Sequence, residues 1–205
     1  MILPSSRIAD LLDGDRTADQ DPLVISPAPD ITGLRETGGA SVDLRLGTWF
    51  LVMKARRHSL LDIYKDAKEA PTVSDLTTKY YIPFNGKFVL HPRSFVLAVT
   101  LEWLRIPQFL AGMVTGKSSW GRRGLIIETA PGIQPGFTGC LTLELSNVGE
   151  IPIALRPGTE ICQMFLHRMD EHAKKVPSTQ FRGQRQPLVT LATEDHFSAA
   201  LMREP

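Results

Sequence analysis

The stretch GKSSWGRRGLIIETAPGIQPGFTGCLTLELSN, residues 116–147, decides the fold that we expect for this chain. Its last part, residues 141–145, alternates leucine with polar residues, which is the period of a β-strand with one buried face. Its middle part, residues 129–139, contains two Pro-Gly pairs and predicts a tight hairpin loop. Its first part, residues 116–119, predicts the entry into a short helix.

The rest of the chain indicates more short strands separated by turns. Residues 40–52 predict a strand, and residues 80–83 and 87–90 predict a hairpin about Asn85-Gly86. A capped amphipathic helix is predicted near the N-terminus, and residues 15–39 have the composition of a loop. Fifteen prolines and sixteen glycines also favour many turns. We therefore expect an all-β barrel or jelly roll with a few short helices.

The length of 205 residues predicts one domain, residues 1–205, with a large enough core to fold alone. The polar composition of residues 170–205 predicts a C-terminal tail. With 23 basic and 22 acidic residues the net charge is +1, so we expect no large basic field and no nucleic-acid polymer as partner.

Targeting and redox signals are few in this sequence. No signal peptide is apparent, and no apolar run approaches the roughly eighteen residues of a membrane span, so we expect a cytoplasmic protein without a membrane partner. The two cysteines, Cys140 and Cys162, are expected to be free, buried thiols. Neither belongs to a Cys-x-x-Cys pair, so the sequence lacks the zinc site of the zinc-dependent deaminases.

Hydroxyl and basic side chains gather at the predicted helix start. Ser118 and Arg122 are four residues apart, so their side chains would lie on one helix face. Ser119 adds a hydroxyl, and Lys117 adds a positive charge. Free amides at a helix start attract anions, so this segment is a candidate phosphate site. The alternative is that Ser118 only caps the helix and Arg122 is a solvated surface charge.

A single acid, Glu144, stands among the leucines of residues 141–145. The alternation places Glu144 and Thr142 on the face opposite the leucines. Glu144 is therefore either an ordinary solvent-facing carboxylate or a general acid and base in a cleft. The loop before it can present backbone amides and carbonyls to a base or sugar, although a simple hairpin connection would also explain it.

These residues together carry a family resemblance. The chain resembles the dCTP deaminases, which belong to the trimeric dUTPase superfamily, over most of its length. The similar segments occur in the family's order and are GASVDLRLG at 39–47, LHP at 90–92, LAVTLE at 97–102, GKSS at 116–119, GR at 121–122, GL at 124–125, TA at 129–130, PGF at 135–137, TLELSN at 142–147, PI at 152–153, RPG at 156–158 and GQR at 183–185.

The resemblance implies a mainly β fold, a distorted β-barrel or jelly roll of the trimeric dUTPase type, with a few short helices. It implies a homotrimer with active sites between subunits and dCTP as the substrate. Glu144 would activate a water for attack on the cytosine and pass its proton to the leaving ammonia. The nucleotide would be bound, with Mg²⁺ on its triphosphate, by residues of the three segments and the tail, namely Lys117, Ser118, Ser119, Arg122, Thr129, Ala130, Gln134, Phe137 and Gln184. The tail would close over the nucleotide from a neighbouring subunit.

One departure from the family affects the expected product. Family members usually have aspartate where this chain has Gln134, and in the pyrophosphatase relatives that aspartate activates water for dUTP hydrolysis. An amide cannot serve as the base, so we expect dCTP to be converted to dUTP and ammonia. The alternatives are a bifunctional deaminase and diphosphatase that forms dUMP, and a nucleotide-binding regulator that has lost turnover.

Overall fold

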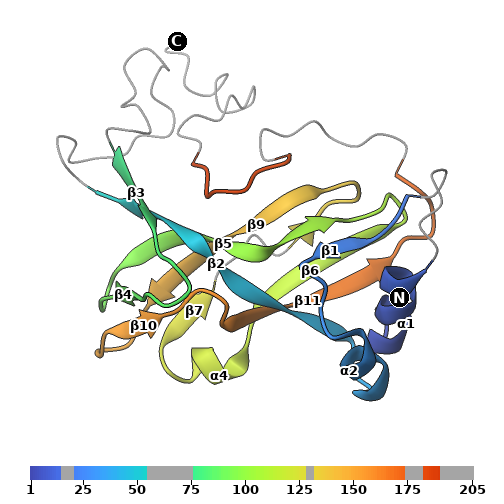
Figure 1. Cartoon of the computed structure of the whole chain (residues 1–205), viewed down its shortest axis with the longest axis horizontal. Helices are drawn as coiled ribbons and strands as arrows, with labels where there is room; N and C mark the ends of the chain where they lie inside the picture. The colour runs from blue at the N-terminus through green and yellow to red at the C-terminus, as the bar shows by residue number, and fades with distance from the viewer. Residues whose placement is uncertain (15–20, 55–75, 128–131, 174–181, 190–205) are drawn as a thin grey trace, which may run out of the picture.

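The computed structural model describes residues 1–14, 21–54, 76–127, 132–173 and 182–189. In these ranges nine strands form one sheet that curls into a half-barrel, with the order β7-β9-β5-β2-β11-β6-β8 and with β1 and β3 added to β5 and β2 (Figure 1). A second sheet pairs β10 with β4. Among the described strands, all of the pairs are antiparallel.

The described elements have the following bounds. The helices are α1 (Ser5–Asp13), α2 (Ile31–Glu36) and α4 (Ser118–Gly121). The strands are β1 (Val24–Ser26), β2 (Ser41–Met53), β3 (Thr77–Tyr81), β4 (Phe88–Leu90), β5 (Phe95–Arg105), β6 (Leu110–Gly116), β7 (Leu125–Ile127), β8 (Gly132–Ile133), β9 (Thr138–Asn147), β10 (Ile153–Leu155) and β11 (Glu160–Arg168).

Strand alternation builds the core on the inner face of the curled sheet. On β9, Leu143 and Leu145 are fully buried, whereas Glu144 on the other face is half-buried. Leu44 and Leu46 of β2 join the same core cluster. Burying leucine side chains of this kind contributes roughly 1.5–3 kcal/mol each, so the apolar inner face holds the sheet in one register.

Two irregularities bend the central strands β2 and β5. The β2–β5 register shifts between Leu46 and Phe50, and the β5–β9 register shifts between Val99 and Trp103. At the bulge of β2 a Cβ atom on Gly47 would lie 2.9 Å from the carbonyl oxygen of Val99, so only glycine fits this close approach. The bulges increase the local twist and help the sheet to close on itself.

A buried carboxylate, Glu102, is satisfied from the neighbouring strand. The backbone amide of Arg45 donates to it at 2.8 Å, and the Nε of Arg45 donates at 2.6 Å. The Glu102 side chain is only 2% exposed, so loss of Arg45 would leave a buried charge without its partner.

The fold class predicted from the sequence is confirmed, and so are several of its elements. The predicted N-terminal helix is α1, and the predicted strand at residues 40–52 is β2. The loop predicted for residues 15–39 was wrong in part, because this segment contains β1 and α2. A strand of three residues and a helix of six residues are too short to show a recognisable hydrophobic period in the sequence.

The hairpin predicted about Asn85-Gly86 was also wrong, although its turn and both strands exist. The amide of Gly86 donates to the carbonyl oxygen of Pro83 at 2.8 Å, which closes the turn. The strands beside it nevertheless pair elsewhere: β3 pairs with β2, and β4 pairs with β10. A turn signal fixes the local chain reversal but not the partner of each strand.

Both cysteines are free and buried, as expected. Burial raises the pKa of the Cys140 thiol, and it raises the pKa of the Cys162 thiol to about 12. None of the helices in the described ranges is long and apolar enough to cross a membrane.

Candidate functional site

The outer face of β9 carries the acid that the sequence singles out. Glu144 lies opposite Leu97 of β5, and Leu97 lies opposite Leu51 of β2. Leu97 and Leu51 are 7% and 1% exposed, so the half-buried carboxylate stands beside an apolar, largely covered surface. A carboxylate held in such surroundings is suited to accept and return a proton.

The tail residue Gln184 reaches the same face of β9. Its Nε2 donates to the carbonyl oxygen of Cys140 and to the Oγ1 of Thr142, both at 2.9 Å. Its backbone also joins the strand, because the amide of Cys140 donates to the Gln184 carbonyl oxygen at 2.8 Å. Thr142 and Glu144 are two residues apart on one strand face, so the structure brings Gln184 close to Glu144.

The carboxamide oxygen of Gln184 has an unusual position. Gln184 is 9% exposed, and its Oε1 is buried without a hydrogen-bond partner among the described residues. A buried acceptor of this kind costs about 1–3 kcal/mol when it has no donor. A bound molecule that offers an N–H or O–H group here would remove that cost.

The turn before β9 carries two more of the predicted site residues. The amide of Phe137 donates to the carbonyl oxygen of Gln134 at 3.1 Å, and Gly136 has a φ of 75°, as the predicted tight turn requires. The Gln134 side chain is exposed, whereas Phe137 is half-buried and packs against the core. The predicted residues Thr129 and Ala130 lie outside the described residues.

The predicted helix start is the short helix α4. Ser118 is its first residue, and the amide of Arg122 donates to the Ser118 carbonyl oxygen at 3.0 Å, so the two residues lie one helical turn apart. Ser118, Ser119 and Arg122 are all exposed. The N-cap is Lys117 rather than Ser118, so the Ser118 hydroxyl is not the helix cap. The side chains of Ser118, Ser119 and Arg122 therefore lie at the surface, where a phosphate can reach them.

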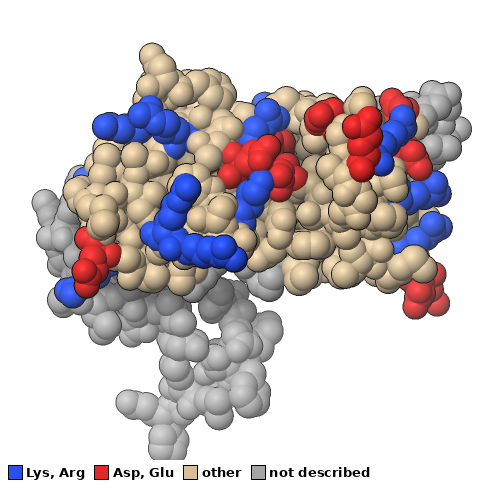
Figure 2. Space-filling model, turned by 90° about the horizontal axis from the view of Figure 1, so that it is seen from below, with Lys and Arg blue, Asp and Glu red and all other residues tan. Residues whose placement is uncertain are grey.

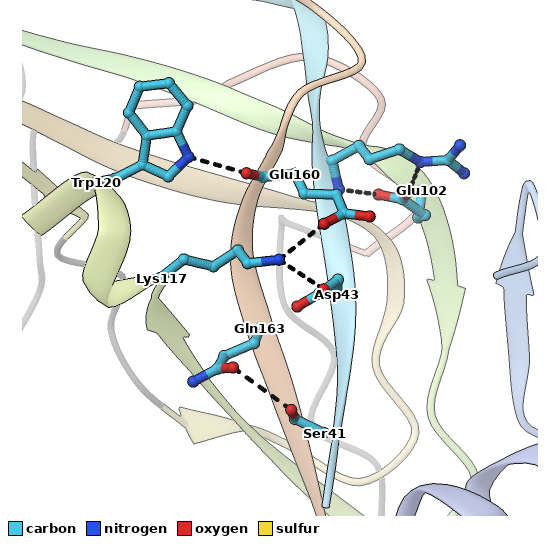
Figure 3. A network of polar contacts seen from close by, with 8 residues as sticks. Ser41, Asp43, Glu102, Lys117, Trp120, Glu160 and Gln163 are labelled. Carbon is cyan, nitrogen blue, oxygen red and sulfur yellow. Dashed lines mark hydrogen bonds and ion pairs between the residues drawn. The ribbon is translucent and has the colours of Figure 1, made fainter. Parts of the chain in front are cut away.

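Lys117 makes two ion pairs within the chain. Its Nζ lies 2.6 Å from Asp43 Oδ2 on β2 and 2.8 Å from Glu160 Oε2 on β11 (Figure 3). Trp120 of α4 donates from its Nε1 to the backbone carbonyl oxygen of Glu160 at 2.9 Å. We call Lys117, Asp43, Trp120 and Glu160 the α4 clamp, because these contacts attach α4 to two strands of the sheet.

The charge states in the α4 clamp support one another. Burial opposes the charged form of Lys117, but its hydrogen bonds to Asp43 and Glu160 together outweigh burial and raise its pKa. The hydrogen bond from Lys117 lowers the pKa of Glu160. The ion pair with Glu160 therefore stabilises the folded protein above the ordinary glutamate pKa of 4.5 and below the ordinary lysine pKa of 10.5.

We expect the stability gain from Glu160 to disappear in acid. Glu160→Gln should lower the free energy of unfolding at neutral pH by about 1 kcal/mol or less, because Glu160 is more than half exposed. As the pH falls below about 4.5 and through the lowered pKa of Glu160, the wild-type protein should lose this advantage. Urea unfolding of both proteins at neutral and at acidic pH measures the difference. An equal difference at both pH values would contradict the ion pair.

The strand β9 orders the candidate residues along the chain. Gln184 contacts it at Cys140 and Thr142, Glu144 follows, and β7 then pairs with it from Leu145 to Asn147. Since β7 comes directly after α4 in the chain, α4 approaches the C-terminal end of β9.

A pocket of about 430 Å³ lies at the other end of β9. Its lining includes Trp49, Trp103, Cys140 and Arg185, but neither Glu144 nor a residue of α4. The lining also includes Val99, which lies opposite Thr142, so the pocket comes within two residues of Glu144 along the strand, roughly 7 Å. Glu144 therefore lies near this pocket but outside its lining.

Surface charge agrees with local rather than extended anion binding. On the face seen in Figure 2, acidic and basic side chains lie intermingled. Within the described residues, no group of three or more His, Cys, Asp and Glu side chains is placed to hold a metal ion. On this face the charges favour phosphate recognition by a few residues rather than by an extended basic field.

Sequence reasoning missed the residues that support the site. Asp43, Trp120 and Glu160 were not among the predicted site residues, and neither was Thr142 as a contact of Gln184. Asp43 and Glu160 come from strands far apart in the chain, and the β2–β11 register that brings them to Lys117 has no signal in the sequence.

Comparison with known proteins places this arrangement in a family. A family model described as dCTP deaminase-like matches residues 2–169. The chain belongs to the dCTP deaminase-like family. A protein named "dCTP deaminase, dUMP-forming" from Parafrankia sp. (strain EAN1pec) is 41% identical over 172 residues, which cover 81% of this chain and 83% of that protein. A protein named "dCTP deaminase" from Halorubrum lacusprofundi is 40% identical over 168 residues, which cover 82% of this chain and 78% of that protein.

A solved structure shares the fold of this dCTP deaminase-like chain. The 2'-deoxycytidine 5'-triphosphate deaminase from Agrobacterium tumefaciens aligns with a TM-score of 0.57 and 23% sequence identity. The alignment covers 82% of this chain and 48% of the Agrobacterium chain, so the similarity spans about half of the solved protein.

Proposed function

We propose that this dCTP deaminase-like chain catalyses the hydrolytic deamination of dCTP to dUTP and ammonia in pyrimidine deoxynucleotide metabolism. The observation that carries the proposal is the order along β9, where Gln184 lies on Thr142, Glu144 follows, and the partner strand β7 leads back to α4. The reaction needs a group that transfers protons, a side chain that covers the bound nucleotide, and a site that binds its phosphates. Glu144, Gln184 and α4 supply these three parts in this proposal. Membership in the family supports the same reading.

In this mechanism Glu144 handles the protons. Its carboxylate takes a proton from a water as the water oxygen forms a bond to C4 of cytosine, and the C4=N3 double bond opens so that N3 receives this proton. The carboxylate then takes the remaining hydroxyl proton and gives it to the amino nitrogen, so that C4=O forms and the C4–N bond to the amino group breaks to release ammonia. Water supplies the new oxygen of uracil, so no bound oxidant or reductant is needed. The apolar surface of Leu97 and Leu51 beside Glu144 supports this role, because it limits solvation of the carboxylate.

The triphosphate is bound at α4 in this proposal. Ser118 and Ser119 donate from their hydroxyls, and Arg122 donates from its guanidinium, all from exposed positions. Mg²⁺ would be bound with the nucleotide and would neutralise part of the triphosphate charge, since Mg²⁺ is often bound through substrate phosphates. The loop with Thr129, Ala130, Gln134 and Phe137 contacts the sugar and base. Gln184 offers its unpaired Oε1 to a donor on the nucleotide.

We also propose that the working form is a cytoplasmic homotrimer with active sites shared between subunits. Ser118, Ser119 and Arg122 are exposed and Glu144 lies outside the lining of the pocket beside Cys140, which supports a site that is completed by a second copy. In this chain the described part of the tail lies on its own β9, at Gly183 and Gln184. Closure by a neighbouring tail would use the same residues on a second copy.

One set of measurements tests the proposed function. We expect the purified protein to release ammonia from dCTP and to bind dCTP in calorimetry, with dUTP and dTTP titrated beside it. Binding without ammonia release would instead indicate a nucleotide-binding regulator. Failure to bind or deaminate any cytosine deoxynucleotide would contradict the proposal.

The product is a separate question, because the two relatives carry different names. The Parafrankia protein is named dUMP-forming, whereas the Halorubrum protein is named only dCTP deaminase. Gln134 favours dUTP as the final product here, because its amide cannot accept a proton from water. A dUMP-forming enzyme is the second candidate function, and the Parafrankia name is the observation that favours it.

We expect no pyrophosphate release when the wild-type protein is incubated with dUTP. Gln134→Asp should restore a hydrogen bond of about 1 kcal/mol to the deoxyribose and should add slow dUTP hydrolysis. Pyrophosphate can be measured from dUTP and from dCTP for both proteins, with Gln134→Asn as the matched amide control. Rapid pyrophosphate release from dUTP by the wild-type protein would show that Gln134 does not govern this step and that the product is dUMP.

A further inference from the structure

The charges around α4 pose a problem for phosphate binding. Lys117 precedes the two serines, and the sequence makes it a candidate phosphate ligand. In the structure its ammonium is already shared between Asp43 and Glu160, at 2.6 and 2.8 Å. Two carboxylates around one ammonium leave a net charge of −1 at this position. Lys117 therefore contributes no free positive charge to the surface of α4.

The contacts of Lys117 instead attach the helix to the sheet. Its amide donates to the carbonyl oxygen of Ile161 at 3.2 Å, and Trp120 donates to the backbone of Glu160 one residue earlier. Trp120 also packs against the core, and the guanidinium of Arg123 lies 5.2 Å from its ring centre. Lys117, at the N-cap, has a side chain that is 25% exposed and that extends from the start of α4 to Glu160 of β11 and Asp43 of β2, as Figure 3 shows.

We propose that Lys117 is a positioning residue rather than a phosphate ligand, and that Asp43 and Glu160 act through it to hold Ser118 and Arg122 in place for the triphosphate. The helix has only four residues, so it lacks the length to hold its own conformation. The α4 clamp supplies the missing rigidity. This inference rests on the proposed function of the same site, because it names what presents the phosphate ligands.

The direction in which triphosphate affinity changes distinguishes a phosphate-binding Lys117 from a Lys117 that positions α4. If Lys117 contacted phosphate, Asp43→Asn or Glu160→Gln would free its charge and remove a nearby negative charge, and triphosphate would bind more tightly. If Lys117 positions α4, the same substitutions loosen the helix and triphosphate binds more weakly. We expect each to weaken binding by about three- to tenfold, as loss of a partly exposed ion pair allows.

The experiment is calorimetry of the full chain with dCTP and with inorganic triphosphate as probes. Asp43→Asn, Glu160→Gln and Lys117→Met should all weaken both ligands by about threefold or more. The double variant Lys117→Met/Glu160→Gln should bind each ligand at most about twofold more weakly than the weaker-binding of its two single variants, because the two substitutions remove the same interaction. Asp13→Asn is the matched control, since it removes a carboxylate that pairs with Arg35 far from α4 in the chain. Tighter or unchanged binding in Asp43→Asn and Glu160→Gln would overturn the proposal.

A second readout does not depend on the nucleotide. Amide hydrogen exchange of the peptide that spans residues 117–124 should be faster in Lys117→Met and Glu160→Gln than in the wild-type protein, and should be restored in Lys117→Arg. Unchanged exchange would overturn the clamp even if dCTP is the substrate. A third outcome separates the clamp from the proposed function. If the variants exchange faster than the wild-type protein, and the wild-type protein binds inorganic triphosphate but neither binds nor deaminates dCTP, the proposed function is refuted and the clamp is supported.

Discussion

Glu144→Gln is expected to lower ammonia release from dCTP by about two to four orders of magnitude, because the amide cannot take the proton from water. Glutamine has nearly the shape of glutamate, so the buried neighbours Leu97 and Leu51 should keep their packing. Binding of dCTP should therefore change little. Steady-state ammonia release and calorimetric binding measure the two effects separately.

The control for this substitution is Glu150→Gln, which changes an exposed glutamate in the loop after β9. It should leave ammonia release unchanged. Thermal unfolding of both variants shows whether the fold is kept. A Glu144→Gln protein that retains more than about a tenth of the wild-type rate would exclude Glu144 as the proton carrier.

Arg122→Ala is expected to weaken triphosphate binding by about 10- to 150-fold, which corresponds to a charge-assisted hydrogen bond of about 1.5–3 kcal/mol. Ser118→Ala should act in the same direction with a smaller effect. Deoxycytidine, which has no phosphate, should bind equally well to the wild-type protein and to both variants. Calorimetry with dCTP and with deoxycytidine gives the comparison.

The neighbouring arginine provides the control for the phosphate experiment. The guanidinium of Arg123 lies over the Trp120 ring, so Arg123→Ala should reduce dCTP affinity only through the general loss of one positive charge. Arg122→Lys keeps the charge but loses the bidentate geometry, and should bind dCTP with intermediate affinity. Equal losses for dCTP and deoxycytidine in Arg122→Ala would place this residue outside the phosphate site.

Much of the fold could be predicted because local patterns determine it. The leucine alternation of β9 identified the strand, its buried face and the outward position of Glu144. The turn residues also formed the turns expected of them, as Gly136 and Gly86 show. Strand partners were not predictable, and the wrong hairpin about Asn85-Gly86 shows why. Pairing depends on which distant strand offers a matching edge, and no short segment contains that information.

The same limit applies to the candidate site. Motif spacing was enough to select Glu144, Ser118 and Arg122, which the structure places half-buried on β9 and exposed at α4. It selected Lys117 as well, because a lysine beside two serines has the composition of a phosphate site. The carboxylates that share its charge are contributed by β2 and β11, so only the assembled sheet reveals them. Residue type predicts what a side chain can bind, and the tertiary structure decides what it does bind.

The contact between the tail and β9 has a consequence for handling the protein. β7 pairs with β9 only from Leu145 to Asn147, and Gly183 and Gln184 bond with the groups of Thr138 and Cys140 nearer the start of the strand. A shortened chain without the tail would uncover these backbone groups, and an uncovered strand edge is a template for pairing with other molecules. Removing the tail to aid crystallisation would therefore expose a strand edge that is prone to aggregation.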